Sequence, residues 1–396
     1  MERMHFWVLL FLSFSPLVQY AIEPWDQLIS NPNSSGEFYE STEIRPAYSL
    51  HTLYLVNNSL NYLKRSSLGT WTSQYVENSR PVFQAAIDLL GQVAHISYAA
   101  NSTSSYGVRY ANNTTGSFQN YLSVPNTITY GFDENAIAVD ATGVVHISHN
   151  AKPSSSTQAQ RETFGTLNSW TNPLLSILTD PIEANADFTG SSIYFSNGRI
   201  IMQGNPRRSN SPVAINVKNP NWATTVALLT NAGSNTCTAG AWGGEAKLSM
   251  WGEGHSVYHC VAAGSPMITH IGYAQNESGA WITSSLAQGP GALPSPSRPV
   301  TFIDKTDTLH LVYEQGGLKY QYRPRKGTWS KVVSLPSGTG TSSHVVAADS
   351  ISSVDIVYVS NNTLKHLSNA SGAWVSKDII TLSTPPKLQK GMKLAY

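Results

Sequence analysis

The stretch from Ser297 to Gly338 reads SRPVTFIDKTDTLHLVYEQGGLKYQYRPRKGTWSKVVSLPSG and shows the unit from which the chain is built. Within it, Leu309, Leu311 and Tyr313 occupy every second position. This period of two is typical of a half-buried β-strand. We therefore expect four short strands, over residues 299–304, 308–314, 318–323 and 328–334.

Turn residues separate these expected strands. Gly316-Gly317 predicts a hairpin between the second and third strands, because glycine adopts positive φ at little cost. Residues 324–327 (PRKG) connect the third strand to the fourth. A single four-stranded meander has two faces to cover, so the unit needs neighbours of the same kind.

Such neighbours recur along the chain at intervals of about 50 residues. The marker is a turn followed by an aromatic residue that opens the fourth strand of each unit. The marker aromatics are Trp71, Phe118, Trp170, Trp222, Trp281, Trp329 and Trp374. This phasing predicts an all-β fold, a seven-bladed β-propeller with four antiparallel strands per blade.

The same phasing sets the expected boundaries. A signal peptide over 1–20 and an N-terminal segment over 21–44 precede the propeller at 45–382, and a C-terminal tail follows at 383–396. The expected blades cover about 45–79, 80–126, 134–180, 181–233, 242–291, 297–338 and 342–381.

One repeat carries a resemblance to a known group of proteins. Residues 140–149 read DATGVVHISH, and similar D-x-x-G-x-x-H segments precede a hairpin and a G-x-W turn in other units. This pattern resembles the secreted propellers of the sialidase-like, or BNR-type, superfamily, which includes glycosidases, polysaccharide lyases and sugar-binding lectins. The full Asp-box of the sialidases, S-x-D-x-G-x-x-W, is absent from the sequence. The resemblance therefore implies a fold and leaves the activity open.

Composition and charge limit the possible partners. Charged residues make up 12% of the chain and the net charge is +1, which does not favour a nucleic-acid partner. The apolar run Phe6–Phe14 is short and follows a basic start, as in a secretory signal peptide. We expect a secreted, periplasmic or cell-surface protein that is not inserted in the membrane after cleavage.

Cysteine usage fits an oxidising compartment. The two cysteines, Cys237 and Cys260, are predicted to form one disulfide. No neighbouring residues have the spacing of metal ligands, so we expect neither a metal nor a cofactor.

Residues that recur at one blade position are interpreted as scaffold. We expect the repeated second-strand histidines to be buried and to hydrogen-bond a turn of their own blade, and the aspartates before them to cap turns. The marker aromatics are expected to pack between blades, with sugar stacking as the alternative. The recurring histidines are His95, His146, His255 and His310.

Departures from the repeat are the candidate sites. His149 stands where other copies carry tyrosine, and it is a candidate base, with Arg161 or Arg109 neutralising a substrate carboxylate. That set would suit a polysaccharide lyase, which removes a proton beside a uronate carboxylate. The alternative is a histidine without catalytic function in a polar loop.

The fifth unit departs most from the others. It carries extra tryptophans beside glycines, a pattern that suits a carbohydrate site in which rings stack on sugar faces and carboxylates accept from hydroxyls. The candidate residues are Trp242, Trp251, Glu253 and His255. The alternative is an elaborated blade that needs the Cys237–Cys260 disulfide for stability.

Three function classes stay open. The leading hypothesis is an exported propeller that binds carbohydrate, in the manner of a lectin. The first alternative is a polysaccharide lyase or glycosidase on the same fold, and the second is a protein-interaction scaffold. Because Ser297–Gly338 is the most regular unit, we expect it to be the least functional one.

Overall fold

The computed structural model describes part of the chain, and within that part every regular element is a β-strand. The all-β prediction is therefore confirmed for the described residues. No helix there is long and apolar enough to cross a membrane. The expected signal peptide and N-terminal segment lie outside the described residues. Those residues are 48–101, 106–123, 135–154, 157–166, 169–171, 178–179, 188–196, 199–206, 213–218, 227–229, 231–232, 235–236, 240–262, 268–290, 299–337 and 341–396.

The largest sheet has eight strands in the order β3-β2-β1-β31-β4-β5-β6-β7. It consists of two antiparallel halves of four strands, joined by one parallel bridge between Lys390 and Ala86. Its strands are β1 (Ser49–Val56), β2 (Ser59–Arg65), β3 (Trp71–Glu77), β4 (Val82–Leu90), β5 (Val93–Asn101), β6 (Tyr106–Asn112), β7 (Gln119–Ser123) and β31 (Lys387–Ala395).

The remaining large sheets are antiparallel meanders whose strands follow one another along the chain. The first two comprise β8 (Asn135–Val139), β9 (Val145–Ser154), β10 (Thr157–Thr166) and β11 (Ser169–Thr171), with β12 (Leu178–Thr179) beside β10, and then β13 (Phe188–Ser196), β14 (Arg199–Pro206), β15 (Val213–Lys218) and β16 (Ala227–Leu229). A two-stranded pair, β17 (Asn231–Ala232) and β18 (Asn235–Thr236), comes next. The last three comprise β19 (Gly240–Leu248), β20 (Gly254–Ala262), β21 (Ile268–Gln275) and β22 (Ile282–Pro290), then β23 (Val300–Ile303), β24 (Leu309–Glu314), β25 (Leu318–Arg323) and β26 (Val333–Ser334), then β27 (Thr341–Ser350), β28 (Ser353–Ser360), β29 (Thr363–Ser368) and β30 (Val375–Thr381).

The stretch that defined the repeat folds as expected in three of its four strands. Gly316 and Gly317 have φ of 62° and 108°, which confirms the glycine hairpin between β24 and β25. The fourth strand is shorter than expected. The Ser330 N–H donates to the Tyr322 carbonyl, and the Tyr322 N–H donates to the Ser330 hydroxyl. The chain around Ser330 is therefore attached to β25 before the two-residue strand β26 begins.

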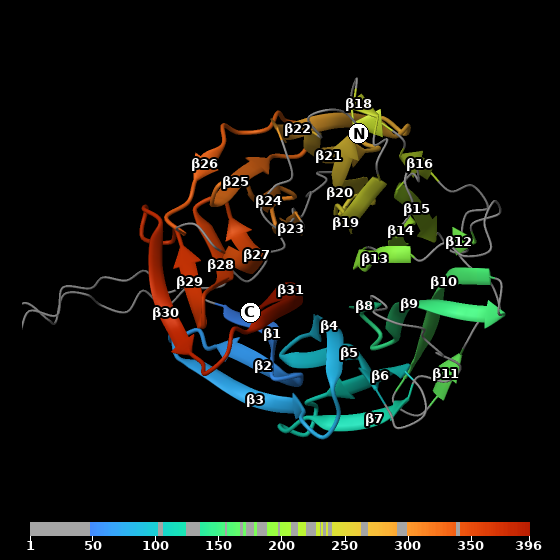
Figure 1. The fold of residues 1–396 in the computed structure, drawn as a ribbon, viewed down its shortest axis with the longest axis vertical. Helices are drawn as coiled ribbons and strands as arrows, with labels where there is room; N and C mark the ends of the chain where they lie inside the picture. The colour runs from blue at the N-terminus through green and yellow to red at the C-terminus, as the bar shows by residue number, and fades with distance from the viewer. Residues whose placement is uncertain are drawn as a thin grey trace, which may run out of the picture. The chain divides into compact units, whose positions relative to one another are not determined.

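Within residues 44–396, which form one compact unit, the sheets are arranged radially (Figure 1). The innermost strand of each meander or half-sheet contacts the innermost strand of the next one (Figure 1). The contacts run β31, β4, β8, β13, β19, β23, β27 and back to β31, so they close a ring. Closure of this kind leaves each sheet covered by a neighbour on both faces, as in a β-propeller.

The segment that we expected to be a C-terminal tail provides one of these inner strands. Strand β31 pairs antiparallel with β1, and its Leu388 and Met392 are buried. The register shifts near Gly391, whose φ is 89°. The three lysines and this bulge obscure the alternation of β31 in the sequence, which explains why the strand was missed.

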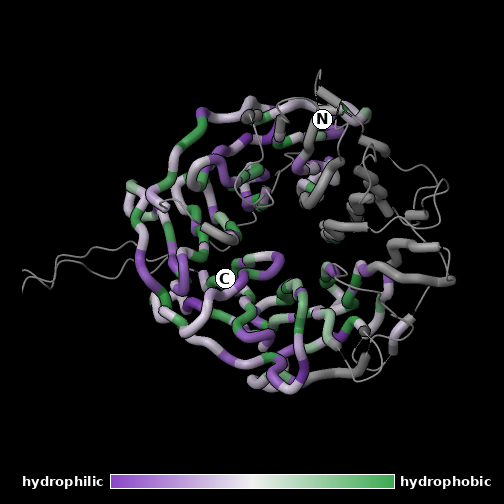
Figure 2. Tube along the Cα trace, viewed as in Figure 1, coloured by the Kyte–Doolittle hydropathy of each residue, from purple (hydrophilic) through white to green (hydrophobic). Residues whose placement is uncertain are grey.

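The apolar core lies between neighbouring sheets. One cluster joins Leu60 and Tyr62 of β2 to Ile96 of β5. Another joins Leu311 of β24 to Val257 of β20. Figure 2 shows the consequence along the described strands, where apolar and polar residues are interspersed.

Candidate functional site

The recurring histidines are buried, as expected, but their shared partner differs from the expected turn. In three sheets the histidine Nδ1 bonds a tyrosine hydroxyl on the third strand, at 2.6–2.9 Å. In the fourth case His146 Nδ1 lies 2.7 Å from a carboxylate oxygen of Glu162. The tyrosine pairs are His95–Tyr110, His255–Tyr273 and His310–Tyr320.

The aspartate before such a histidine caps its turn. Asp304 Oδ1 accepts from the Thr306 and Thr308 N–H groups, and its Oδ2 lies 3.0 Å from His310 Nε2. These hydrogen bonds, together with those from His310, hold the pKa of Asp304 below its usual value against the cost of burial. The expected role of the aspartates as turn caps is confirmed here.

The marker aromatics pack against the preceding sheet. In each described pair the ring meets a third-strand aromatic of that sheet edge to face, with centroids 5.0–5.4 Å apart. Trp71 of β3 meets His366 of β29 in this way, so the motif also joins the last sheet to the first. The other pairs are Phe118–Tyr62, Trp170–Tyr110, Trp329–Tyr273 and Trp374–Tyr320.

The candidate lyase residues are spread over two sheets. His149 is fully buried in β9, and its Nε2 lies 2.9 Å from Thr163 Oγ1. Arg161 is opposite His149 in the β9–β10 register, but its side chain lies outside the described residues. Arg109 belongs to β6 of the preceding sheet, opposite Tyr98. A substrate carbon could reach the His149 imidazole only after the surrounding side chains had moved.

The candidate residues of the fifth unit are more informative. Trp251 and Glu253 lie in the turn between β19 and β20, where Ser249 Oγ accepts from the N–H groups of both residues. Ser249 thus takes the capping position that Asp304 holds in the next sheet. Gly252, with φ of 76°, closes the turn. Trp251 is left at the tip with 60% of its surface exposed.

A second sheet completes this site. Arg325 follows β25, and its Nη2 and Nε donate to the two carboxylate oxygens of Glu253 at 2.8 and 2.9 Å. The same guanidinium carbon lies 4.5 Å from the centroid of the Trp251 ring. Asp307 Oδ2 lies 3.5 Å from Arg325 Nε. The arginine is therefore held over the indole by carboxylates from both sheets.

A parallel pair lies behind the first one. Arg323 Nη1 and Nη2 donate to the two oxygens of Glu277 at 2.5 and 2.9 Å. The guanidinium of Arg323 also lies 5.7 Å from the centroid of Tyr273, the partner of His255. We name the whole group the Trp251 cluster, and it comprises Trp251, Glu253, Glu277, Asp307, Arg323 and Arg325.

The charge states in the Trp251 cluster follow from these contacts. The hydrogen bonds from Arg325 and Arg323 lower the pKa values of Glu253 and Glu277, so both carboxylates are ionised at neutral pH. Burial lowers the pKa of His255 to about 4, so its imidazole is neutral. Burial raises the pKa of Asp307. Each ionised glutamate therefore has a guanidinium as its counter-ion.

These ion pairs bear on metal binding. One ligand atom from each of Glu253, His255 and Glu277 lies within 4.8 Å of the others. A cation at that point would compete with two guanidinium groups that already hold both carboxylates in two-pronged contacts. The existing ion pairs therefore oppose the binding of a cation at this point.

The remaining predicted residues are placed only in part. Trp242 lies in β19 opposite His259, and its side chain lies outside the described residues. Cys260 lies in β20 opposite His270, whereas Cys237 lies outside the described residues. The disulfide therefore stays a prediction.

Sequence reasoning missed the half of the cluster that comes from the regular unit. Arg323, Arg325 and Asp307 all belong to Ser297–Gly338, which we expected to be the least functional unit. A site built between two sheets needs only one of them to depart from the repeat. The available signal was the pair of arginines around Pro324, which a scaffold turn does not require.

Comparisons with known proteins do not assign a family. No family model and no curated protein sequence matches the chain. Among solved structures, a fungal lectin from Aleuria aurantia, described as a six-bladed β-propeller, is 13% identical, with 78% of this chain and 97% of that chain covered and a TM-score of 0.46. AofleA from Arthrobotrys oligospora is 10% identical, with 88% and 91% covered and a TM-score of 0.44. An α-L-arabinanase from Penicillium chrysogenum is 10% identical, with 70% and 88% covered and a TM-score of 0.48.

Proposed function

We propose that this chain is an exported, seven-bladed β-propeller that binds carbohydrate, and that the Trp251 cluster is its binding site. The observation that supports the site is the placement of Arg325, clamped by Glu253 over the exposed indole of Trp251. Seven blades are supported by the closed cycle of inner strands, in which β31 completes the first four-stranded half-sheet. Export rests on the apolar run at Phe6–Phe14 and on the low content of charged residues.

The chemistry of the cluster suits a sugar. An exposed indole offers a flat apolar surface for the C–H face of a pyranose ring, and the ring loses little conformational freedom on binding. The Arg325–Glu253 pair provides donors and acceptors in one fixed plane, which can bond two adjacent hydroxyls. One small area of the surface would therefore both stack on the sugar ring and form hydrogen bonds with its hydroxyls.

The charges favour a neutral glycan. Glu253 and Glu277 are each neutralised by an arginine, and Asp307 adds a third carboxylate nearby. An acidic sugar would bring a carboxylate toward three others, so its repulsion would offset the attraction to the guanidinium groups. We therefore expect neutral sugars to bind in preference to uronates at this site.

The direct test is glycan-array binding by the mature chain and by Trp251→Ala. We expect the wild type to bind a neutral glycan and Trp251→Ala to lose at least tenfold in affinity. Tyr75→Ala is the matched control, because Tyr75 is an aromatic residue of the first sheet with 63% of its surface exposed. A folded wild type that binds no glycan would count against the proposal, as would equal losses in the two variants.

The same samples separate the alternative classes. A lyase would release an unsaturated product that absorbs in the ultraviolet from a uronate polymer. A glycosidase would release reducing ends. A protein-interaction scaffold would show neither of these products and no dependence on glycan. The buried position of His149 offers no support for the lyase alternative.

A further inference from the structure

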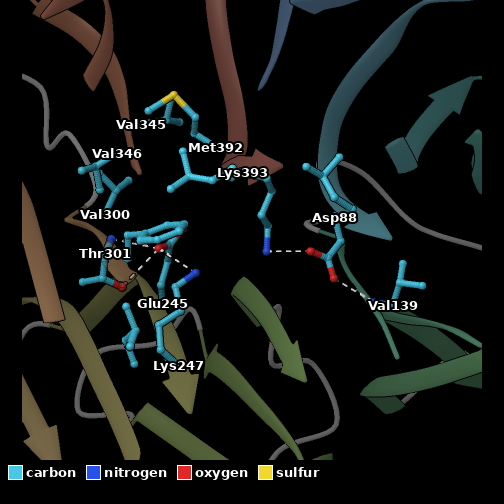
Figure 3. A pocket seen from close by; sticks show the side chains of 15 residues that line it. Asp88, Val139, Glu245, Lys247, Val300, Thr301, Val345, Val346, Met392 and Lys393 are labelled. Atoms are coloured by element: carbon cyan, nitrogen blue, oxygen red, sulfur yellow. Dashed lines mark hydrogen bonds and ion pairs between the residues drawn. The ribbon is translucent and has the colours of Figure 1, made fainter. Parts of the chain in front are cut away.

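A second polar site lies at the inner strands, away from Trp251. A cavity of about 240 Å³ is lined by residues of β4, β8, β19, β23, β27 and β31 (Figure 3). Two lysines enter it from different strands, Lys247 from β19 and Lys393 from β31. Figure 3 shows the amino groups of both lysines directed into the same space.

Each lysine has a carboxylate neighbour. Lys393 Nζ lies 2.8 Å from Asp88 Oδ1, and Lys247 Nζ lies 3.4 Å from Glu245 Oε2. Both carboxylates are also held by the backbone. Asp88 Oδ2 accepts from the Val139 N–H at 2.8 Å. Glu245 Oε2 accepts from the N–H and hydroxyl of Thr301 at 2.9 and 3.2 Å. The acids are thus fixed to the wall of the cavity.

The lining of the cavity carries two lysines and two carboxylates. A third ammonium group, that of Lys390 of β31, does not line the cavity but is near enough to lower the pKa of Glu245. Strands β8 and β23, which also line the cavity, carry no Asp, Glu, Lys or Arg. The ammonium groups of the lining therefore come from β19 and β31.

We propose that this cavity binds one small oxyanion, a carboxylate or a phosphate, between the ammonium groups of Lys247 and Lys393. The two ammonium groups repel each other, and an anion between them would be attracted to both. The repulsion from Asp88 and Glu245 is reduced because backbone N–H groups of Val139 and Thr301 donate to these carboxylates. The space accommodates a group of this size with some of its water. A metal cation would meet the same lysines and is disfavoured by them.

The electrostatics of Lys247 agree with this geometry. Burial lowers the pKa of Lys247, and the positive charge of Lys393 lowers it further, while Glu245 opposes both effects. A bound anion would act on the pKa of Lys247 in the same direction as Glu245. The exposed fractions of the Lys247 and Lys393 side chains are 14% and 18%, and both residues line the cavity.

The test uses inorganic phosphate and glucuronate as probes of the full mature chain, with chloride replacing them at constant ionic strength. We expect saturable binding with one site per chain by calorimetry and a rise in Tm. Binding of both probes identifies a general oxyanion site. Phosphate alone indicates a free inorganic anion, and glucuronate alone indicates the carboxylate of an acidic sugar.

The decisive variant removes one ammonium group without leaving a charge unpaired. Glu245→Gln with Lys247→Gln should weaken oxyanion binding at least tenfold. The control changes the exposed pair Lys365–Asp378 on β29 and β30 to Gln and Asn, and it should bind as the wild type does. Trp251→Ala should also bind the oxyanion normally, which separates this site from the proposed carbohydrate site.

Two outcomes would overturn the proposal. One is a folded wild type that shows no saturable binding of either probe. The other is undiminished binding after Lys247 has been replaced. If the double variant does not fold, a wild-type crystal soaked in selenate gives the answer. An anomalous peak between the Nζ atoms of Lys247 and Lys393 supports the proposal, and a map without a peak there contradicts it.

Discussion

The guanidinium carbon of Arg325 lies 4.5 Å from the centre of the Trp251 ring, although the two residues belong to different sheets. The arginine is held there by Glu253, which shares the turn of Trp251. One face of an exposed indole is therefore fixed by an ion pair that spans the boundary between the sheets. This arrangement orders the aromatic ring without a ligand, which would reduce the entropy lost on binding the proposed glycan.

Two substitutions of Arg325 should distinguish the contribution of its charge to glycan affinity from that of its planar geometry. We expect Arg325→Ala to lower glycan affinity at least tenfold, which corresponds to about 1.4 kcal/mol. Arg325→Lys should recover only part of the loss, because an ammonium group cannot make the two parallel hydrogen bonds to Glu253. Calorimetric titration with the best array glycan gives the measurement.

Lys331→Ala is the control for this series, since Lys331 is an exposed cation of the same unit. Its affinity should equal that of the wild type. If Arg325→Lys bound as tightly as the wild type, the two-pronged contact would be irrelevant to recognition, and only a positive charge would be needed.

His310 should prove structural rather than functional. Its Nδ1 lies 2.8 Å from the Tyr320 hydroxyl and its Nε2 lies 3.0 Å from Asp304, and all three side chains are buried. His310→Leu leaves a carboxylate and a hydroxyl without this partner, so we expect a loss of about 2–4 kcal/mol in the free energy of unfolding. Tyr320→Phe removes one neutral hydrogen bond and should cost about 1 kcal/mol. Urea unfolding measures both.

Glycan affinity provides the cross-check for His310. Below the unfolding transition, His310→Leu should bind glycan as the wild type does. A variant that is as stable as the wild type but has lost binding would show that the imidazole belongs to the site instead.

The scaffold could be predicted from the sequence because it is repeated. The alternation in Ser297–Gly338 and the spacing of the marker aromatics required only local patterns, and strands β23 to β25 follow them. Strand β31 was missed because its lysines and bulge obscure the alternation, and its partner β1 lies more than 300 residues earlier in the chain. No local pattern marks that pairing.

Only half of the candidate site could be predicted from the sequence. Trp251 and Glu253 stood out because they break the repeat at a turn. Arg325 did not, since its contacts with Glu253 and Trp251 depend on the sheet that the ring places beside it. A residue in a regular unit can become part of a candidate site when the adjacent unit departs from the repeat. Recognising such a residue requires the contacts between sheets, which a single sequence does not display.

Acid should destabilise the protein below neutral pH through its buried histidines. Burial lowers the pKa values of His51, His255, His259 and His344 from 6.5 to about 4. Between these values the unfolded chain binds protons that the folded chain excludes. The unfolding free energy should therefore fall as the pH drops from about 6.5 toward 4, by at most about 1.4 kcal/mol per pH unit for each histidine.

Urea unfolding at pH 7.0, 5.5 and 4.5 measures this slope. His344→Gln should reduce this slope by up to one proton, because glutamine does not titrate. Its side-chain amide can still donate to the Val312 carbonyl that His344 Nε2 contacts at 3.3 Å, so the variant keeps this hydrogen bond. A stability that stays constant between pH 7 and 4.5 would contradict the assigned burial of these imidazoles. Glu253 and Glu277 act at lower pH, since their depressed pKa values give a stabilisation that is lost only below about pH 4.5.

Removal of residues 387–396 should open the ring. Strand β31 hydrogen-bonds to β1, contacts β4 and β27, and buries Leu388 and Met392. Without it, the edge of β1 exposes unpaired backbone groups and the first half-sheet loses its inner strand. We expect the truncated chain to lose cooperative unfolding and to aggregate, as measured by circular dichroism and size-exclusion chromatography.

Smaller changes in β31 should show how much single residues contribute to the stability of the ring. Met392→Ala should cost about 2–5 kcal/mol, because it leaves a cavity between β31 and its neighbours. Deletion of Tyr396 alone should cost little, since 66% of its surface is exposed. Addition of a synthetic 383–396 peptide should restore the cooperative transition of the truncated chain, because the peptide can re-form the same antiparallel pairing. If the truncated chain unfolds as cooperatively as the full one without the peptide, β31 does not close the ring.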